Sequence, residues 1–315
     1  MDQEIVLAAD LGGTNLRMAA VDRQGTILCR AGRETPHGEN LAEIVRAIIE
    51  TAVECRENCA DFKVAAMAAA VPGTLDVKGG KIITSPNLPA LNSFQMAAAL
   101  EDALGVPAVL ENDANAAAVG ENWLGASKNC RDSICVTLGT GVGGGVMIDG
   151  KILRGADGKA GEIGHLCVES RGAPCRCGSQ GCVEQYASAS AIVRIAKELT
   201  AEYPASVVKN HARLKAHEVF EAGKKGDALA LEVFRQMGFY LGVAFSSLIN
   251  VLNPEIIVIG GGASAGWELF APSMQKTIRQ RSYGGHAERT KILRGELGDD
   301  AGILGAAHLA FNLSA

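Results

Sequence analysis

The stretch EIVLAADLGGTNLRMAAVD, from Glu4 to Asp22, decides the fold class of this 315-residue chain. An apolar run ends at Asp10, a short glycine turn follows, and a second, alternating run completes the stretch. This order predicts two strands joined by a tight turn. Because glycines let a phosphate approach the backbone closely, Gly12, Gly13 and Thr14 could hold one, with Asp10 orienting a metal-bound water. An ordinary hairpin turn is the alternative interpretation.

The same pattern returns between residues 133 and 150, where the strand SICVTLG precedes the turn TGVGGG and the second strand VMIDG. The glycines fit G-x-G-x-x-G, but a dinucleotide-binding fingerprint requires a helix next, and this segment is typical of a strand. Gly145 to Lys151 nearly fits a P-loop, but Ile152 stands where Ser or Thr would hold magnesium. We therefore expect a second phosphate-facing turn, with the Thr140 hydroxyl and nearby amides as donors.

A third glycine loop, GGGAS at 260–264, follows the buried strand predicted within EIIVIGGG at 255–262. Bare backbone at this point would suit an adenine or a ribose lying against it. Three such loops, each after an apolar strand, indicate a protein with two similar lobes that handles nucleotide phosphates.

Helices are predicted between these strands from the spacing of apolar residues. They cover Leu41–Asn58, Ser93–Leu104, Asn115–Trp123, Ser188–Glu202, Ala216–Leu252 and 299–312. Ser93 is the expected N-cap of its helix, and Gly105 is expected to end it. We predict a small α/β domain of residues 1–113 plus 299–315 and a large α/β domain of residues 114–298 that contains a metal site.

Composition argues against several classes of protein. The net charge is −5 and no run of Lys or Arg occurs, so a nucleic-acid surface is not expected. The N-terminus carries acids where a signal peptide carries positive charge, and no apolar stretch reaches the roughly 18 to 20 residues of a membrane helix. We expect a cytoplasmic protein without a membrane partner, whose nine cysteines are thiols.

Polar side chains in three loops are candidates for binding a small ligand. VLENDANAAAVGE places Asn112 and Asp113 between a strand and a helix, beside a domain boundary, where small ligands bind. An Asn–Asp pair suits a polyol, because the carboxylate accepts a hydroxyl proton; a helix N-cap is the alternative. Asn87 lies between two prolines in SPNLP, which fixes its amide for a hydroxyl or forms an ordinary turn. VPGTLD, which contains Gly73, is a similar loop.

Four potential metal ligands, His165, Cys175, Cys177 and Cys182, lie within 18 residues. A CysCysCysHis set has no open position and is typical of a structural zinc site rather than a catalytic one. Clustered thiols in a reducing compartment favour zinc over a disulfide. The sequence therefore predicts structural Zn²⁺.

The motifs DLGGTNLR, VPG, PNLP, ENDANAAAVGE, LGTGVGGG, GEIGH, CRCGSQGCVE and GGGAS follow one another in this order. Over nearly the whole chain this order resembles the ROK family (repressors, open-reading-frame proteins and sugar kinases), and most closely its bacterial glucokinases. The resemblance implies a two-domain actin-like fold of the ribonuclease-H-like, hexokinase type with a cleft between the domains. It also implies ATP, Mg²⁺, a hexose in the cleft, and a homodimer formed through the large domain.

The resemblance also assigns roles to residues at matching positions. Asp113 would be the general base that takes the proton of the sugar 6-hydroxyl. The implied sugar-binding residues are Gly73, Asn87, Asn112, Asp113, Glu162, His165 and Glu184. The implied nucleotide-binding residues are Asp10, Gly12, Gly13, Thr14, Asn15, Arg17, Thr140, Gly141, Gly261 and Gly262. Zinc would fix the geometry of Glu162 and Glu184, and His165 could use one ring nitrogen for zinc and the other for a sugar hydroxyl.

The resemblance leaves the acceptor and the donor open. Glucose is the expected hexose, but N-acetylmannosamine, fructose, mannose and allose share the hydroxyls in question, and polyphosphate could replace ATP. A sugar sensor without turnover is a second class. The intact Asp113 argues against it, as does a first strand near Ile5, where the family's repressors carry a helix-turn-helix domain. A bare zinc-binding module is a third class, and the single CxC pair, without a CxxC pair beside it, argues against it.

Overall fold

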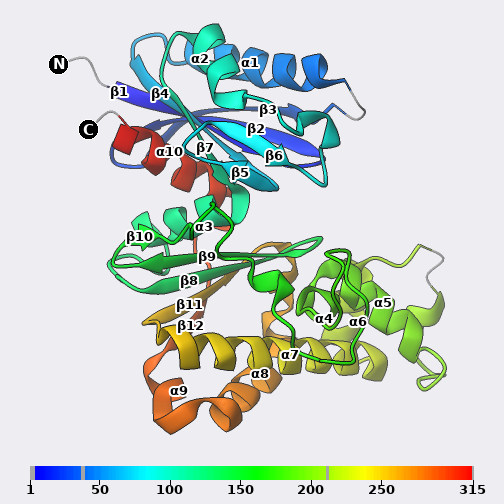
Figure 1. Ribbon diagram of the computed structural model, residues 1–315. Helices are drawn as coiled ribbons and strands as arrows, with labels where there is room; N and C mark the ends of the chain where they lie inside the picture. The colour runs from blue at the N-terminus through cyan, green and yellow to red at the C-terminus, as the bar shows by residue number, and fades with distance from the viewer. Residues whose placement is uncertain (1–3, 37–39, 211–212, 314–315) are drawn as a thin grey trace. The chain divides into compact units, whose positions relative to one another are not determined.

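A computed structural model describes residues 4–36, 40–210 and 213–313 of the chain (Figure 1). Packing contacts divide the chain into two compact units. The first comprises Met1–Arg131, Gly145–Gly161 and Glu296–Ala315, and the second comprises Asp132–Gly144 and Glu162–Gly295. Two five-stranded sheets, each with parallel and antiparallel pairs, form the framework of this α/β protein.

The first sheet has the strand order β3-β2-β1-β4-β7. Its strands are β1 (Glu4–Leu11), β2 (Asn15–Asp22), β3 (Ile27–Glu34), β4 (Lys63–Val71) and β7 (Ala108–Asn112). β1 pairs antiparallel with β2 and parallel with β4, and β4 pairs parallel with β7. The predicted strand–turn–strand at the N-terminus is confirmed. The edge strand β3 was not predicted; it has no fully buried residue and therefore lacks the apolar run that identified β1.

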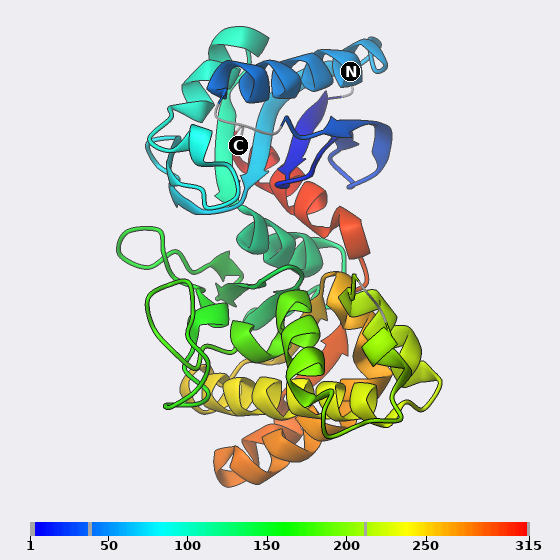
Figure 2. The same cartoon turned by 90° about the vertical axis from the view of Figure 1, so that its right-hand side faces the viewer.

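Alternation along β1 sends its side chains into two different cores. Ile5 and Leu7 pack in one core with residues of α1 and α2, whereas Val6 and Ala8 pack in another with residues of α10. These helices are α1 (Leu41–Glu57), α2 (Met96–Leu104) and α10 (Ala301–Leu313). Helices thus cover both faces of the sheet, as Figures 1 and 2 show. A strand buried on both faces is apolar throughout, which explains the composition of β1.

Of the two residues predicted to bound α2, Gly105 is confirmed and Ser93 is not. Gly105 adopts a left-handed φ of 70° and donates its N–H to the Glu101 carbonyl at 2.8 Å, which ends the helix as predicted. Ser93 is not the N-cap, because the helix begins at Met96. Ser93 instead has a φ of 62° and donates its backbone N–H to the Ile83 carbonyl at 3.3 Å.

Two helices of the first unit, α3 (Asp113–Trp123) and α10, approach each other closely because they meet at glycines. A Cβ added to Gly305 would lie 1.7 Å from the carbonyl oxygen of Ala116, and one added to Gly120 would lie 2.1 Å from that of Ala301. This contact places α3 in the first unit, whereas the second domain was expected to begin at residue 114. Smaller elements here are β5 (Thr74–Asp76), β6 (Lys81–Thr84), η1 (Pro89–Leu91) and η6 (Gly298–Asp300).

The second sheet has the order β10-β9-β8-β11-β12. Its strands are β8 (Ser133–Leu138), β9 (Val142–Ile148), β10 (Lys151–Ile152), β11 (Ile256–Gly260) and β12 (Lys291–Arg294). The predicted turn TGVGGG is shorter than expected, because three of its glycines, 143–145, belong to β9. A Cβ on Gly145 would lie 2.5 Å from the Cβ of Ala118, so this glycine allows close packing of strand and helix rather than a turn.

The second unit is rich in helices. They are α4 (Glu184–Ala187), α5 (Ala189–Leu199), α6 (Ala216–Lys224), α7 (Ala228–Leu252), α8 (Trp267–Arg281) and α9 (His286–Arg289), with the 3-10 turns η2 (Ile163–His165), η3 (Val207–Asn210), η4 (Gly262–Gly266) and η5 (Tyr283–Gly285). The single helix predicted over 216–252 is two helices, because Gly226 takes a left-handed φ of 85° and Asp227 caps α7. The helix α8 was not predicted.

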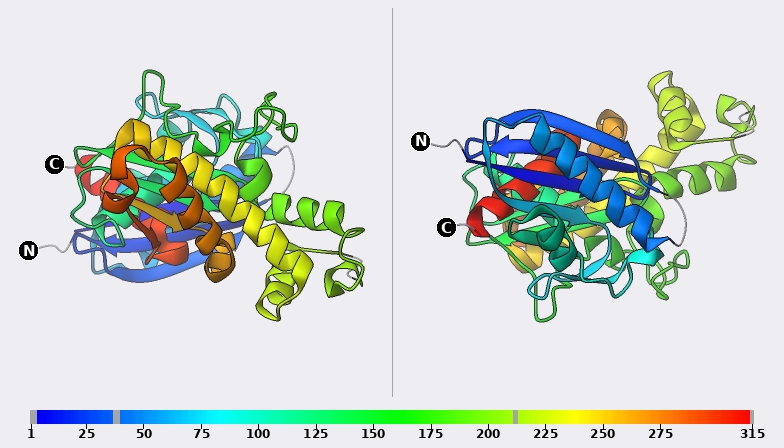
Figure 3. Two further views of the ribbon diagram at one scale, coloured as in Figure 1. Left: turned by 90° about the horizontal axis from the view of Figure 1, so that it is seen from below. Right: turned by 90° about the horizontal axis from the view of Figure 1, so that it is seen from above.

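The helix α7 is long and apolar enough to span a membrane, although no stretch of that kind was expected from the sequence. Its most apolar window has a mean hydropathy of 1.2, and 56% of that window is buried inside the protein. Much of this burial is against α8, which runs beside it (Figure 3). Burial of this kind is typical of the core helix of a globular unit.

The α3–α10 contact leads to a stability prediction. Gly305→Ala should lower the free energy of unfolding by about 1–3 kcal/mol, because the new methyl group meets backbone that cannot move aside. Gly302→Ala is the matched control in the same helix, since its Cβ would lie at an ordinary 3.6 Å from the nearest atom. Denaturant unfolding should show the control at or above wild-type stability. Equal stability of the two variants would contradict the packing argument.

Candidate functional site

The parallel strands of the first sheet bring predicted site residues to one edge. β1, β4 and β7 run in the same direction, so their carboxyl ends lie together. Asp10 lies near the end of β1, Gly73 follows β4, and Asn112 ends β7. The carboxyl edge of such strands is where small ligands bind in α/β proteins. The topology therefore gathers residues that are far apart in the sequence.

The turn between β1 and β2 is held by its own backbone and by a residue after β3. Gly12 donates its N–H to the Asn15 carbonyl at 2.9 Å. Thr35 donates its hydroxyl to the Gly12 carbonyl at 2.7 Å and its N–H to the Thr14 carbonyl at 2.8 Å. Thr35 was not predicted, because no motif identifies it. Because carbonyls of the turn are used in these bonds, its geometry is set before any ligand arrives.

Asn87 and the first glycine turn lie side by side, as the assignment of both to one ligand site requires. A Cβ added to Gly13 would lie 3.3 Å from the Cβ of Asn87. Gly73 also has a structural reason to be glycine, since its φ is 122° and a Cβ would lie 2.1 Å from the Thr84 carbonyl oxygen. Because glycine can take this conformation, the loop after β4 can pass close to Thr84 at the end of β6.

Asp10 lies among charged groups, and its pKa is raised to about 6. Burial is the main cause, and the neighbouring Asp113 carboxylate adds to it. Arg17 opposes the shift, and Asp299, which forms a 3.0 Å ion pair with Arg17, adds to it. The N-terminal turn of α10 also lies nearby, since a Cβ on Gly302 would be 3.6 Å from the Asp10 carboxyl carbon. Two carboxylates that repel each other favour a cation between them.

Asn112 is the N-cap of α3, which was the alternative to a ligand-binding role for the Asn112–Asp113 pair. Its Oδ1 accepts the N–H groups of Ala114 at 3.0 Å and Asn115 at 3.1 Å. Its Nδ2 donates to the Gly73 carbonyl at 3.2 Å, which leaves one N–H of the amide for another acceptor. Capping does not exclude the proposed contact with a sugar, but it limits that contact to donation.

Asp113 is the first residue of α3, and its side chain is exposed to solvent. Its Oδ1 accepts the Ala114 N–H at 2.9 Å. Surrounding protein still removes enough water from the carboxylate to raise its pKa, against the lowering effect of Ala114 and Asn112 as donors. Asp113 is therefore a stronger base than a free aspartate and remains accessible to a hydroxyl group.

In the second unit, the turn between β8 and β9 is held from the segment 184–190. Gly139 accepts the Ala189 N–H at 2.9 Å through its carbonyl, and Thr140 accepts the Ser190 hydroxyl at 3.1 Å in the same way. Glu184 Oε2 accepts the Val142 N–H at 3.0 Å. Glu184, predicted to contact a sugar, thus has one carboxylate oxygen committed to this turn.

The third glycine loop meets the second turn. Gly261 has a φ of 80°, and a Cβ there would lie 2.5 Å from the carbonyl oxygen of Leu138, the last residue of β8. Gly262 starts the short turn η4, and a Cβ added to it would have no atom within 4 Å. The two predicted glycine sites of this unit are therefore neighbours, joined by backbone that only glycine allows to come so close.

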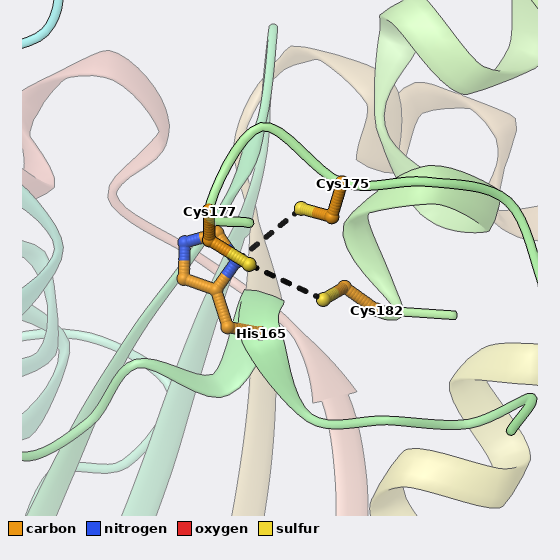
Figure 4. A group of neighbouring side chains, drawn as sticks. All are labelled: His165, Cys175, Cys177 and Cys182. Carbon is orange, nitrogen blue, oxygen red and sulfur yellow. Dashed lines mark hydrogen bonds between the residues drawn. The ribbon is translucent and has the colours of Figure 1, made fainter. Parts of the chain in front are cut away.

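His165, Cys175, Cys177 and Cys182 come together as predicted, with their ligand atoms all within 4.8 Å of one another (Figure 4). Cys175 Sγ lies 3.7 Å from His165 Nδ1, and Cys177 Sγ lies 3.7 Å from Cys182 Sγ. Tetrahedral zinc with Zn–S bonds of about 2.3 Å requires sulfurs about 3.8 Å apart. The group therefore fits zinc and is too open for a disulfide, whose sulfurs would be about 2 Å apart.

The imidazole of His165 turns Nδ1 toward the cysteines, which leaves Nε2 for another partner. Glu162 directly precedes η2, and its side chain is exposed, as is that of His165. Between them, Gly164 packs against β9, where a Cβ would lie 2.0 Å from the Val142 carbonyl oxygen. Gly164 and Glu184, which lie close to members of the metal-binding group in the sequence, thus both contact Val142, the first residue of β9.

Asp10 gives a prediction about stability and pH. Its folded pKa of about 6 lies above the ordinary value of 3.8, so the folded chain binds a proton more readily than the unfolded chain. Asp10 therefore destabilises the fold above pH 3.8, and fully above its folded pKa. Asp10→Asn should raise the melting temperature by a few degrees in neutral, metal-free buffer and should lose this gain in acid. A gain that did not change with pH would contradict the assignment.

The zinc prediction can be checked directly. Purified protein should contain one zinc per chain by elemental analysis, and Cys177→Ser should reduce both the zinc content and the melting temperature. Cys167→Ser is the matched control, because Cys167 is an exposed cysteine of the same segment outside the four-residue group. Equal zinc content in both variants would show that Cys177 is not a ligand.

The chain is similar to known proteins over nearly its whole length. The ROK family profile matches residues 6–312. A glucokinase of Thermotoga maritima is 36% identical over 311 residues, which cover 96% of each chain. A xylose repressor of Caldicellulosiruptor bescii is 27% identical over 95% of this chain and 76% of its own.

A crystal structure of a ROK family glucokinase from Streptomyces griseus, in complex with glucose and AMPPNP, superposes with a TM-score of 0.83. It is 35% identical and covers 98% of this chain and 99% of its own. The predicted actin-like ATPase fold is thereby confirmed. The chain belongs to the ROK family.

Proposed function

We propose that the chain is an ATP-dependent hexose kinase that transfers the γ-phosphate to the 6-hydroxyl of glucose. The observation that carries the proposal is the state of Asp113, an exposed carboxylate of raised pKa at the carboxyl ends of the parallel strands β1, β4 and β7. A general base must be accessible to the proton it takes and works best when its pKa is raised toward the working pH. The 36% identity to a glucokinase supports glucose as the acceptor.

In the proposed reaction, Asp113 accepts the proton of the sugar hydroxyl as that oxygen attacks phosphorus. Ala114 holds the carboxylate through its N–H, and Asn112 and Asn87 would donate hydrogen bonds to the sugar. Gly12, Gly13 and Thr14 would present backbone N–H groups to the nucleotide phosphates. Asp10 would hold magnesium or its water, and the ion would neutralise phosphate charge. Phosphoryl transfer depends on such positioning and charge neutralisation more than on covalent chemistry.

The assignments in the second unit stay predictions. Thr140 and Gly141 are assigned to the phosphates, and Gly261 and Gly262 to the adenosine. Glu162, His165 and Glu184 are assigned to the sugar. The other implied nucleotide contacts, at Asn15 and Arg17, the homodimer and the cytoplasmic location are also predictions.

A sugar sensor without turnover is the second candidate, because a xylose repressor matches 95% of this chain. The raised pKa of Asp113 favours the kinase, since a sensor needs hydrogen bonds to a sugar but no base. An assay of sugar-phosphate formation over glucose, N-acetylmannosamine, fructose, mannose and allose would distinguish them, with ATP and then polyphosphate as the donor. The sugar with the highest kcat/KM is the acceptor. Sugar binding without formation of a sugar phosphate from either donor would identify a sensor.

Substitution of Asp113 tests the base. Asp113→Ala should lower kcat by about 10²-fold or more, while calorimetry should show that sugar binding partly survives. Asp113→Asn keeps the shape and should be equally inactive. Asp102→Ala, which removes an exposed acid of α2, is the control and should keep wild-type kcat. A near-normal kcat in Asp113→Ala would show that another group is the base.

A further inference from the structure

A buried carboxylate without a role in the sequence-based assignments directly precedes the Asn112–Asp113 pair. Glu111, in β7, is only 2% exposed. Its Oε2 accepts Nε and Nη2 of Arg154 at 3.0 and 2.7 Å. Its Oε1 accepts the backbone N–H of Asn112 and Nδ2 of Asn115, both at 3.0 Å. Four donors thus satisfy a charge whose burial would otherwise be costly.

Arg154 reaches Glu111 from a loop that is 43 residues away in the sequence. The backbone of the same residue holds that loop, since the Arg154 carbonyl accepts the Ala160 N–H at 3.1 Å. Gly155, with a φ of 71°, turns the chain between them. Arg154 therefore fastens the loop 154–160 to the junction of β7 and α3, within the first unit.

The Glu111 carboxylate contacts this junction through one of its oxygens, Oε1, while Oε2 accepts from Arg154. It fixes the backbone of Asn112 and the side chain of Asn115, the third residue of α3. Asn112 in turn caps the helix whose first residue is Asp113. If Arg154 were removed, the buried carboxylate would lose two of its four donors and would have to rotate or draw in water, and the Asn112 N–H would lose its fixed acceptor.

We propose that Arg154, acting through Glu111, is a positioning residue that sets the geometry of the Asp113 carboxylate. The inference rests on the proposed role of Asp113 as the base. A small displacement of a reacting group, of the order of 1 Å, can reduce a rate by about 10²-fold. Arg154 touches no reacting atom in this account, so its removal should lower kcat more than it changes nucleotide binding.

The experiment compares three variants of the full-length chain. Arg154→Met removes both donors, and Arg154→Lys keeps the charge but cannot make the paired contact. Arg23→Met is the control, because Arg23 forms a 2.9 Å ion pair with Glu4 at the opposite end of β1 from Asp10. Kinetics with glucose and ATP and hydrogen exchange of the peptide covering 111–115 are measured for each.

The proposal predicts that Arg154→Met lowers kcat by about 10- to 100-fold and leaves the KM for ATP within about threefold. Amide exchange in 111–115 should become faster, Arg154→Lys should recover part of both effects, and the control should match wild type. A folded Arg154→Met with wild-type kcat and exchange would overturn the proposal, even if it melted at a lower temperature.

Two further outcomes are decided by the same measurements. If Arg154→Met does not fold, the double variant Glu111→Gln with Arg154→Met removes both charges of the pair and takes its place. If wild type releases no ADP in response to any sugar, the proposed function fails. Exchange in 111–115 then still tests whether Arg154 orders the junction, and unchanged exchange would overturn that part.

Discussion

The parallel arrangement of β1, β4 and β7 is the constraint on which the candidate site depends. It places Asp113 close enough to Asp10 for the Asp113 carboxylate to disfavour the charge of Asp10. The fold keeps this repulsion because the α3–α10 contact, made through Gly120 and Gly305, holds the helix that begins at Asp113 against the sheet. Stability is thereby reduced at the place where a cation bound between the two carboxylates would relieve their repulsion.

In the second unit, hydrogen bonds from a neighbouring segment hold the glycine turn between β8 and β9 in one conformation. Three hydrogen bonds join residues 184–190 to the segment 139–142 around the β8–β9 turn. Glu184 lies two residues after Cys182, a member of the metal-binding group. A metal bound by the four-residue group would therefore hold the segments that carry Glu162 and Glu184, and Glu184 holds this turn. Zinc in this position would act on geometry and not on the reacting atoms, as a closed Cys₃His set requires.

Much of the fold and of the candidate site could be predicted from local sequence, because motifs such as DLGGTNLR and the CysCysCysHis set combine residue type with fixed spacing. The strand–turn–strand, the metal group and the end of α2 at Gly105 are of this kind. Thr35, Glu111 and Arg154 could not be predicted, since each acts through a partner distant in the sequence that only the folded sheet brings near. The prediction for Ser93 is wrong because a good capping residue can also occupy a turn, and the predicted turn is too long at Gly145 because glycine also permits close packing.

The central claim is that the sheet edge bearing Asp113 receives the sugar 6-hydroxyl. The most direct measurement is ADP release with 6-deoxyglucose, which lacks that hydroxyl, together with its inhibition of glucose turnover. The account predicts no ADP release above background and competitive inhibition, with an inhibition constant close to the KM for glucose. Release of ADP from ATP in the presence of 6-deoxyglucose, at a rate similar to that with glucose, would contradict it.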